Sequence, residues 1–343
     1  MVGTTMHSRP RDAKEALIGV GAGAATGALL LSLLVGSGAA RAATAGFSAG
    51  VNGGTLNIQG GPVAERIALR LSPNASQLLV DVGDDGSAER AFDLTSFAAI
   101  TVDAGNGDDV VLIDQTNGAF TTTKPTTIAG GNGNDTLLGG GGAETFLGGR
   151  GDDVADGNGG GDTAFMGKGD DTFIWDPGDG SDRFEGGPGS DTMVFNGAPG
   201  TDVMAANANG GRIRFTRVQG TIVMDLDDVE AIDVRALAGA DSITVGDVGG
   251  TDIRRVDVDL ATSLTDARSD GAADTVTVLG TNGVDTIRAS ALGGVTEVSG
   301  LAATVHVLHA DPELDALVLD SRDGADDVSV DNAVEDLVLV SVK

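Results

Sequence analysis

The sequence contains no cysteine, no tyrosine and one tryptophan, and aromatic residues make up only 3% of its 343 positions. Without cysteine, disulfides cannot stabilise the fold and no lipid can be attached to a thiol. So few rings exclude a compact core filled by aromatic side chains. Basic residues are also scarce, with 21 against 51 acidic residues and a net charge of −30, which argues against a nucleic-acid partner because phosphate binding needs basic patches.

Glycine, β-branched residues and carboxylates dominate instead. The chain has 55 glycines, and 41% of its positions are hydrophobic, which argues against a fully disordered acidic chain. The length allows two ordinary domains or one longer repeat array. Because carboxylates at this density need cations, we expect a metal to stabilise a fold that has no disulfides.

The N-terminus has the pattern of a targeting segment. Arg9, Arg11 and Lys14 precede an uncharged run over residues 16–40, and Ala40-Arg41-Ala42 follows. This predicts a secretory signal peptide over residues 1–42 and an extracellular protein. An uncleaved membrane anchor is the alternative, although six glycines in the run and the cleavage site favour removal. No later segment is apolar enough to span a bilayer, so we expect no membrane span in the mature chain.

Acidic residues recur at nearly constant spacing in the middle of the chain. They follow glycine-rich turns such as GGNGND at residues 130–135, with spacings of 9, 9, 9, 9, 11 and 9. Consecutive glycines permit turns with positive φ and leave backbone carbonyls open, and these carbonyls are hard oxygen donors suited to Ca²⁺. The acidic positions are Asp135, Glu144, Asp153, Asp162, Asp171, Asp182 and Asp191.

Two positions after each acidic residue lies the predicted inward side chain of a short strand. These side chains are Leu137, Phe146, Ala155, Ala164, Phe173, Phe184 and Met193. Two nonapeptides make one coil, so turns 18 residues apart should stack about 4.8 Å apart. One edge then carries Asp135, Asp153, Asp171 and Asp191, and the other carries Glu144, Asp162 and Asp182.

Stacked carboxylates of this kind favour calcium on physical grounds. Two carboxylates one coil apart repel by roughly 3–4 kcal/mol at an effective dielectric of about 20. A divalent cation between adjacent turns converts that repulsion into coordination. Because the cation binds only the coiled state, it should drive folding.

These segments resemble the hemolysin-type calcium-binding repeat, the RTX nonapeptide G-G-x-G-x-D-x-U-x. The best copies are residues 130–138, 148–156, 166–174 and 186–194, and residues 104–112 are an outlying copy. The resemblance implies a calcium-binding parallel β-roll over residues 104–194. It implies ligands at Asp109, Asp135, Asp153, Asp171 and Asp191, with further oxygen from the preceding Asp108, Asn134, Asp152, Asp170 or Ser190.

The copies on the second edge depart from the motif. Ala143 precedes Glu144 and Gly161 precedes Asp162, so this edge should bind fewer ions. The two-residue insertion within residues 175–182 is expected to bulge the roll and give Trp175 a place to pack, although a simple β-turn is the alternative.

The flanks have weaker patterns. Residues 43–103 are predicted to be a β-rich segment, in which Asp81–Gly86 is a hairpin turn rather than an EF-hand loop. Residues 195–343 are predicted to be an irregular β-solenoid or β-sandwich. Here an aspartate precedes several strands, as at Asp241 and Asp274, and it either binds calcium or forms a turn. The last apolar strand, residues 337–343, lacks a polar cap, so we expect it to pair with another chain or a cell surface, unless the array is truncated.

Taken together, the sequence predicts an all-β protein with a parallel β-roll or β-helix solenoid and β-rich flanks. The expected function is that of a secreted, non-enzymatic calcium-binding module with a structural or interaction role. A secreted hydrolase or polysaccharide-modifying enzyme carrying an RTX roll is one alternative, and an adhesin or matrix component is the other. Ser48 lies in a G-x-S-x-G pattern, but its histidine partners would have to be His306 or His309, the only ones after residue 42.

Overall fold

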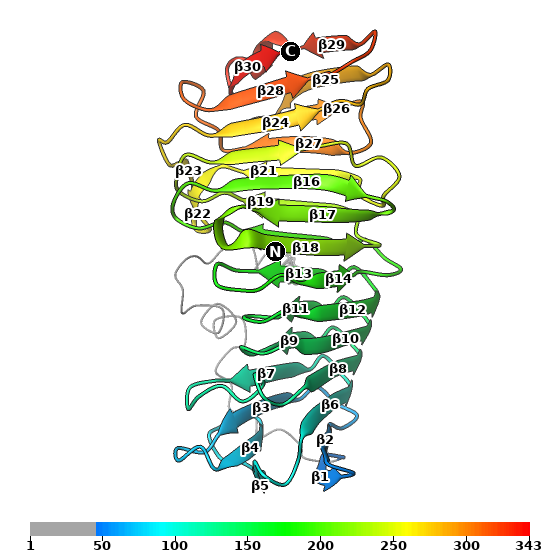
Figure 1. The fold of residues 1–343 in the computed structure, drawn as a ribbon, viewed down its shortest axis with the longest axis vertical. Coiled ribbons are helices and arrows are strands. Elements are labelled where there is room, and N and C mark those ends of the chain that lie inside the picture. The colour runs from blue at the N-terminus through cyan, green and yellow to red at the C-terminus, as the bar shows by residue number, and fades with distance from the viewer. Residues whose placement is uncertain (1–45) are drawn as a thin grey trace, which may run out of the picture.

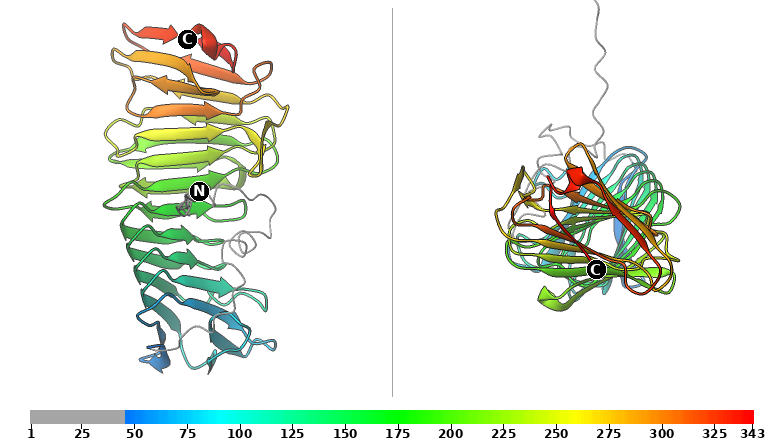
Figure 2. Two further views of the ribbon diagram at one scale, coloured as in Figure 1. Left: turned by 180° about the vertical axis from the view of Figure 1, so that it is seen from behind. Right: turned by 90° about the horizontal axis from the view of Figure 1, so that it is seen from above.

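The computed structural model describes residues 46–343, and this part of the chain is all-β without an α-helix. The predicted signal peptide therefore lies outside the described residues. Two sheets of fourteen strands each run along the long axis of an elongated molecule (Figures 1 and 2). A coiled parallel architecture was predicted for the centre and β-rich structure for the flanks, and both expectations are confirmed.

The first sheet, called sheet A, contains one strand of most coils, together with the additional strands of a terminal hairpin and of a meander. In spatial order it consists of β1 (Ser48–Asn52), β2 (Thr55–Gln59), β6 (Ala99–Asn106), β8 (Thr126–Asn132), β10 (Glu144–Arg150), β12 (Thr163–Lys168), β14 (Arg183–Glu185), β18 (Ile222–Asp227), β17 (Arg212–Arg217), β16 (Val203–Asn209), β20 (Ser242–Val245), β24 (Thr275–Leu279), β28 (Ala316–Asp320) and β30 (Leu339–Val342).

The second sheet, called sheet B, contains the returning strands. From the N-terminal end of the molecule it consists of β5 (Arg90–Asp93), β4 (Gln77–Val82), β3 (Arg66–Leu71), β7 (Val110–Asp114), β9 (Thr136–Leu138), β11 (Val154–Asp156), β13 (Thr172–Trp175), β15 (Thr192–Asn196), β19 (Ala231–Arg235), β21 (Arg255–Asp259), β27 (Thr304–Leu308), β26 (Val295–Ser299), β25 (Thr286–Leu292) and β29 (Asp327–Val330). A separate hairpin, β22 (Ala261–Ser263) and β23 (Asp266–Ser269), and two 3₁₀ turns, η1 (Gln219–Thr221) and η2 (Asn332–Val334), complete the described elements.

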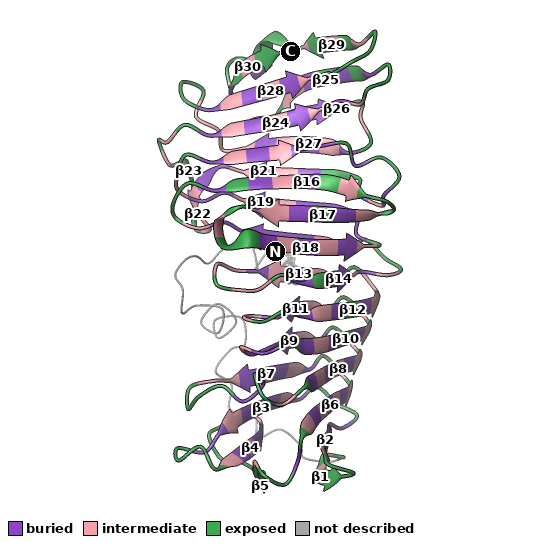
Figure 3. Cartoon of the chain, in the orientation of Figure 1, coloured by how far each residue is buried: buried purple, intermediate pink, exposed green. Residues whose placement is uncertain are grey.

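The core lies between the two sheets and is continuous along the molecule (Figure 3). All seven predicted inward side chains are fully buried, from Leu137 to Met193. The register also agrees with an 18-residue coil, because Phe146 pairs with Ala164 in sheet A and Ala155 pairs with Phe173 in sheet B. Alternation along each short strand therefore points one side chain inward and its neighbours outward.

Two antiparallel meanders interrupt the coil in the C-terminal half. The first, β16–β17–β18, inserts two additional strands into sheet A, so that β19 follows β15 directly in sheet B while β20 follows β16 in sheet A. The second, β25–β26–β27, inserts two additional strands into sheet B. Between the meanders, sheet A is two strands ahead of sheet B, about 10 Å at the usual strand spacing, and the second meander cancels this offset.

Two local predictions are also confirmed. The insertion at residues 175–182 seats Trp175, which is fully buried, stacks on Phe195 with ring centroids 4.1 Å apart and donates from Nε1 to the Gly180 carbonyl at 2.8 Å. Asp81–Gly86 spans the last two residues of β4 and the start of the connection that leads to β5, its antiparallel partner. Asp81 is buried and forms an ion pair with Arg70. Among residues 46–343, no helix has the length and apolar character needed to cross a bilayer.

Candidate metal centre

A file of buried acidic residues runs along the edge where each turn leads into sheet B. In this inner ladder, the backbone N–H of each residue donates to the carboxylate of the next coil at 2.6–2.8 Å. The predicted edge is therefore present and extends further than the motif, because an acid from each flank joins its ends. Its members are Glu65, Asp109, Asp135, Asp153, Asp171, Asp191 and Glu230.

A second file, the outer ladder, lies beside it on the exposed side of the same turns. Here too each backbone N–H bonds to a side-chain oxygen of the neighbouring coil, at 2.8–3.0 Å, but the donor belongs to the later coil. The structure thus brings together the residues that were predicted to supply additional oxygen. These are Asp108, Asn134, Asp152, Asp170 and Ser190.

The opposite edge carries a shorter file, formed by Glu144, Asp162 and Asp182. The N–H of Glu144 donates to Asp162 Oδ1 at 2.6 Å, and the N–H of Asp162 donates to Asp182 Oδ1 at 2.8 Å. Glu144 also accepts the N–H of Gly140 at 2.7 Å. Since Ala143 and Gly161 precede the first two acids, the carboxylates of an outer ladder are missing at those positions, as expected from the sequence.

One oxygen of each ladder carboxylate accepts a hydrogen bond from a backbone N–H group. The other oxygen is the one that could bind a metal ion. The second oxygen is buried and has no hydrogen-bond partner in Asp109, Asp135, Glu144, Asp153, Asp162, Asp182 and Asp191. Burying a charged oxygen without a partner is unfavourable by several kcal/mol. Hard oxygen ligands of this kind fit Ca²⁺, which takes six to eight of them in flexible geometry.

Burial controls the protonation of these acids. Desolvation raises the pKa of Asp153 to about 8 and that of Asp162 to about 9, and the charges of neighbouring ladder acids add to the effect while backbone hydrogen bonds oppose it. Desolvation likewise raises the pKa of Asp109 and Asp191 to about 7. Without a cation Asp153 and Asp162 therefore hold protons near neutral pH, and a bound cation would displace them.

The glycines of the turns bring backbone carbonyls close to the carboxylates. Gly133 and Gly151 have φ of +127° and +119°, a region that favours glycine. A Cβ on Gly151 would lie 2.1 Å from the carbonyl oxygen of Gly133 in the preceding coil. Only glycine therefore allows the turns to stack this closely, with carbonyl and carboxylate oxygens in the same narrow layer.

Three acids near the second edge were not predicted as ligands. Asp156, Asp176 and Asp179 lie close enough that their charges act on one another and on Asp182. Burial, then these charges, raises the pKa of Asp156 to about 7 and that of Asp179 to about 8. The pairing of β11 with β13 places Asp156 beside Ile174, so Asp156 and Asp176 do not occupy equivalent positions of adjacent coils, and no regular spacing in the sequence could have identified this group.

Several other polar groups of the C-terminal half have partners. His306 Nδ1 lies 2.8 Å from Asp257 Oδ1 and His309 Nδ1 lies 2.7 Å from Asp259 Oδ1, so each histidine has its own aspartate partner. Asp227, Asp228 and Asp252 place carboxylate oxygens within 4.8 Å of one another. Arg212 already binds Asp227 at 2.6 Å, which partly neutralises this group.

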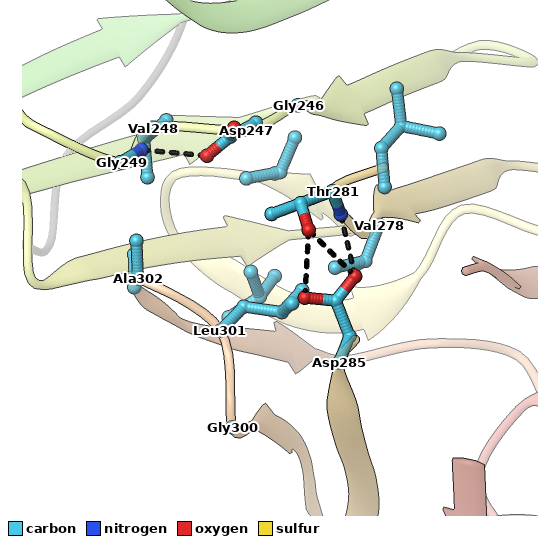
Figure 4. Close-up of a pocket in the computed structure, with 14 residues that line it drawn as sticks. Gly246, Asp247, Val248, Gly249, Val278, Thr281, Asp285, Gly300, Leu301 and Ala302 are labelled. Carbon is cyan, nitrogen blue, oxygen red and sulfur yellow. Dashed lines mark hydrogen bonds between the residues drawn. The ribbon is translucent and has the colours of Figure 1, made fainter. Parts of the chain in front are cut away.

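A cavity of about 300 Å³ lies at the second meander, between the turns that follow β20, β24 and β26 (Figure 4). Its wall is mainly apolar, with Val278 and Leu301 among its residues. Asp285 accepts hydrogen bonds from the backbone N–H and the hydroxyl of Thr281, as Figure 4 shows. Asp247, the other carboxylate of the wall, accepts the N–H of Gly249 at 2.8 Å, so both carboxylates are engaged by their own turns.

Comparison with known families agrees with this geometry. A family model, the RTX calcium-binding nonapeptide repeat (4 copies), matches residues 126–155, 138–173 and 177–208. A search of curated proteins found no match. Residues 126–208 therefore carry RTX calcium-binding nonapeptide repeats, and the chain is a calcium-binding repeat protein.

Proposed function

We propose that these repeats make the chain a secreted module that folds when it binds Ca²⁺ and then serves a structural or interaction role outside the cell. The observation that carries this proposal is the inner ladder, whose buried second oxygens lack partners at Asp109, Asp135, Asp153 and Asp191. A divalent cation supplies the missing partner. The same ion removes the repulsion between stacked carboxylates.

The ladder residues would hold calcium together with the turn carbonyls. Asp135 and Asp153 would each contribute their second oxygen, and the exposed Asn134 and Asp152 would add oxygen from the outer ladder. Because the ligands come from adjacent coils, binding requires the coils to be stacked. Ion binding and folding are then a single linked process.

Linked folding suits a protein that crosses a membrane before it folds. In the low calcium of the cytosol the repeat region stays extended, and in the higher calcium outside it coils. The pattern over residues 1–42 supports export. Sequencing the N-terminus of the protein from culture medium tests this, with Ala43 as the expected first residue; retention of residues 1–42 on a cell-bound protein contradicts export by cleavage.

A non-catalytic role belongs to the same proposal. In the described residues, Ser48 lies on β1 at the N-terminal end of sheet A, whereas His306 and His309, bonded to Asp257 and Asp259, lie on or next to β27 in the C-terminal half of sheet B, so no nucleophile–base pair forms among them. The ladder acids are likewise held by the backbone of the neighbouring coil. Substrate turnover abolished by changing any of these residues would contradict this part of the proposal.

Circular dichroism during a calcium titration tests the central claim. The purified chain should gain β-sheet signal as Ca²⁺ is added, and Mg²⁺ should be much less effective because it demands a compact octahedral set of ligands. Full β-sheet signal in chelator, unchanged by calcium, would show that the stacked acids need no metal.

A further inference from the structure

The turns of the C-terminal half also carry a file of buried acids, although the family match ends at residue 208. Asp202, Asp241, Asp274 and Asp315 precede strands β16, β20, β24 and β28 of sheet A. The N–H of each of the first three donates to Oδ1 of the following acid, at 2.7, 2.7 and 2.9 Å. This C-terminal ladder repeats the bonding of the calcium turns across coils of 33 to 41 residues.

The backbone of the turn before Asp241 also matches that of the repeats. Gly239 stands two residues before Asp241, as Gly133 stands before Asp135, and it has φ of +139°. A Cβ on Gly239 would lie 2.5 Å from the carbonyl carbon of Gly200 and 2.7 Å from its oxygen, in the turn below. The close stacking that brings carbonyls beside carboxylates is therefore retained where the nonapeptide motif is lost.

The two ends of the C-terminal ladder are neutralised by the protein itself. Arg217, from the first meander, binds Asp202 Oδ1 with Nη2 at 2.8 Å, and both side chains are nearly buried. At the other end, Asp315 accepts the N–H of Asp274 at one oxygen and the N–H of Asp311 at the other. The carboxylate of Asp202 is therefore paired with a positive charge, and both oxygens of Asp315 accept hydrogen bonds.

The two middle acids lack such compensation. Asp241 and Asp274 are 2% and 1% exposed, and the second oxygen of each is buried with no hydrogen-bond partner. A third carboxylate, Asp270, lies between their turns, where Oδ2 accepts the N–H of Gly239 at 2.6 Å and Oδ1 accepts the N–H of Ala272 at 2.7 Å. The charge of Asp270 acts on both Asp241 and Asp274, so the acids of these two adjacent turns form one electrostatically linked group.

We propose that Asp241 and Asp274, with Asp270 beside them, bind one further Ca²⁺ in the C-terminal solenoid. A site made of carboxylate and carbonyl oxygens with two unpartnered buried anions suits a hard divalent cation. This proposal rests on the proposed function only in assuming that the bound metal is calcium. Its residues lie outside the matched repeats, so the two claims can fail separately.

Counting bound calcium in the full chain tests the proposal. The double variant Asp241→Asn/Asp274→Asn keeps side-chain size and the Oδ1 acceptors of the ladder but removes both charges. After equilibrium dialysis against saturating Ca²⁺ with excess Mg²⁺, metal analysis should give one ion fewer than the parent. Asp323→Asn, a change at an exposed turn acid, should leave the count unchanged.

A repeat variant, Asp153→Asn, separates the possible outcomes. If it loses calcium while the double variant keeps the parental count, the C-terminal acids are held by protons and this inference is overturned, whereas the proposed function stands. If neither variant loses calcium, both fail. If the double variant does not fold, hydrogen exchange of the Asp153→Asn variant tests the C-terminal site instead. In that variant, peptides over residues 236–279 should exchange at least tenfold more slowly when calcium is present. Equal exchange with and without calcium would overturn the site.

Discussion

The repeat half and the C-terminal half have the same two-sheet architecture but neutralise their acids differently. From Asp109 to Asp191, acid stacks on acid and small side chains such as Ala155 and Ala164 fill parts of the core. Beyond residue 200, arginines enter, and Arg212 binds Glu185, Asp225 and Asp227 at 2.6–2.7 Å. On the proposed function the repeat half would need an external cation, whereas the C-terminal half supplies arginine partners for some of its own acids.

Core composition adds to this difference. The repeat strands β9 and β11 have three residues each, while β19, β21 and β28 have five and bury Val, Ile or Leu at alternate positions. Each fully buried aliphatic side chain contributes roughly 1.5–3 kcal/mol. A short strand with alanine, such as β11, contributes less, so the apolar stabilisation of the repeat half comes mainly from a few large buried rings, such as Phe146, Phe173 and Phe184.

Removing calcium should produce the largest effect and should separate the two halves. In chelator, we expect residues 104–194 to exchange their amide hydrogens at nearly unfolded rates, while β19, β21 and β28 retain strong protection. Hydrogen exchange followed by peptide mass spectrometry, with and without Ca²⁺, gives this comparison directly. Equal loss of protection in both halves would mean that the arginine-paired half is no more independent than the repeats.

Lowering the pH should restore part of the order that the repeat half loses when calcium is chelated. Because burial raises the folded-state pKa of Asp153 to about 8 and of Asp191 to about 7, the calcium-free coil binds more protons than the unfolded chain, whose aspartates titrate near 4. Its stability is therefore highest near pH 4–5 and is lost as the pH rises toward 8. In chelator, the repeat half should be more ordered at pH 5 than at pH 8.

With calcium present, the pH dependence of stability should have the opposite sign, because protons compete with the ion for the same carboxylate oxygens. The calcium midpoint followed by circular dichroism should rise as the pH falls from 8 to 5. Parallel pH dependence with and without the ion would contradict the assignment of these acids as ligands.

Breaking the ion pair between Arg217 and Asp202 should produce the next largest loss of stability. Arg217→Ala leaves Asp202 buried at 1% exposure without its charge partner, a change that typically destabilises by about 3–5 kcal/mol. Denaturant unfolding should show this loss in the C-terminal half, with the calcium midpoint of the repeats unchanged. Arg268→Ala is the matched control because its pair with Asp266 is exposed, and it should have no measurable effect.

Much of the repeat half could be predicted because its period is short and regular. The nine-residue spacing fixed which side chains point inward and which acids share an edge, and Phe146 and Asp153 lie as expected. The two meanders could not be predicted, because the offset they create and cancel depends on pairing between strands far apart in sequence. The roles of Glu65 and Glu230 were missed for the same reason, since only stacking of the flanking coils brings them to the ladder.

The smallest expected effect, a change at one rung of the inner ladder, sharpens the comparison most. Asp153→Ala removes the acceptor of the Asp135 N–H at 2.8 Å and a candidate ligand oxygen. Loss of one charged hydrogen bond is worth about 1.5–3 kcal/mol, so the calcium midpoint should rise roughly tenfold or more, and Asp171→Ala should act in the same direction. Ser48→Ala, on the exposed strand β1, is the control and should leave the midpoint unchanged. If Asp153→Ala lowers protection in β28 as much as in β11, the solenoid responds as one cooperative unit, and the halves differ in composition but not in stability.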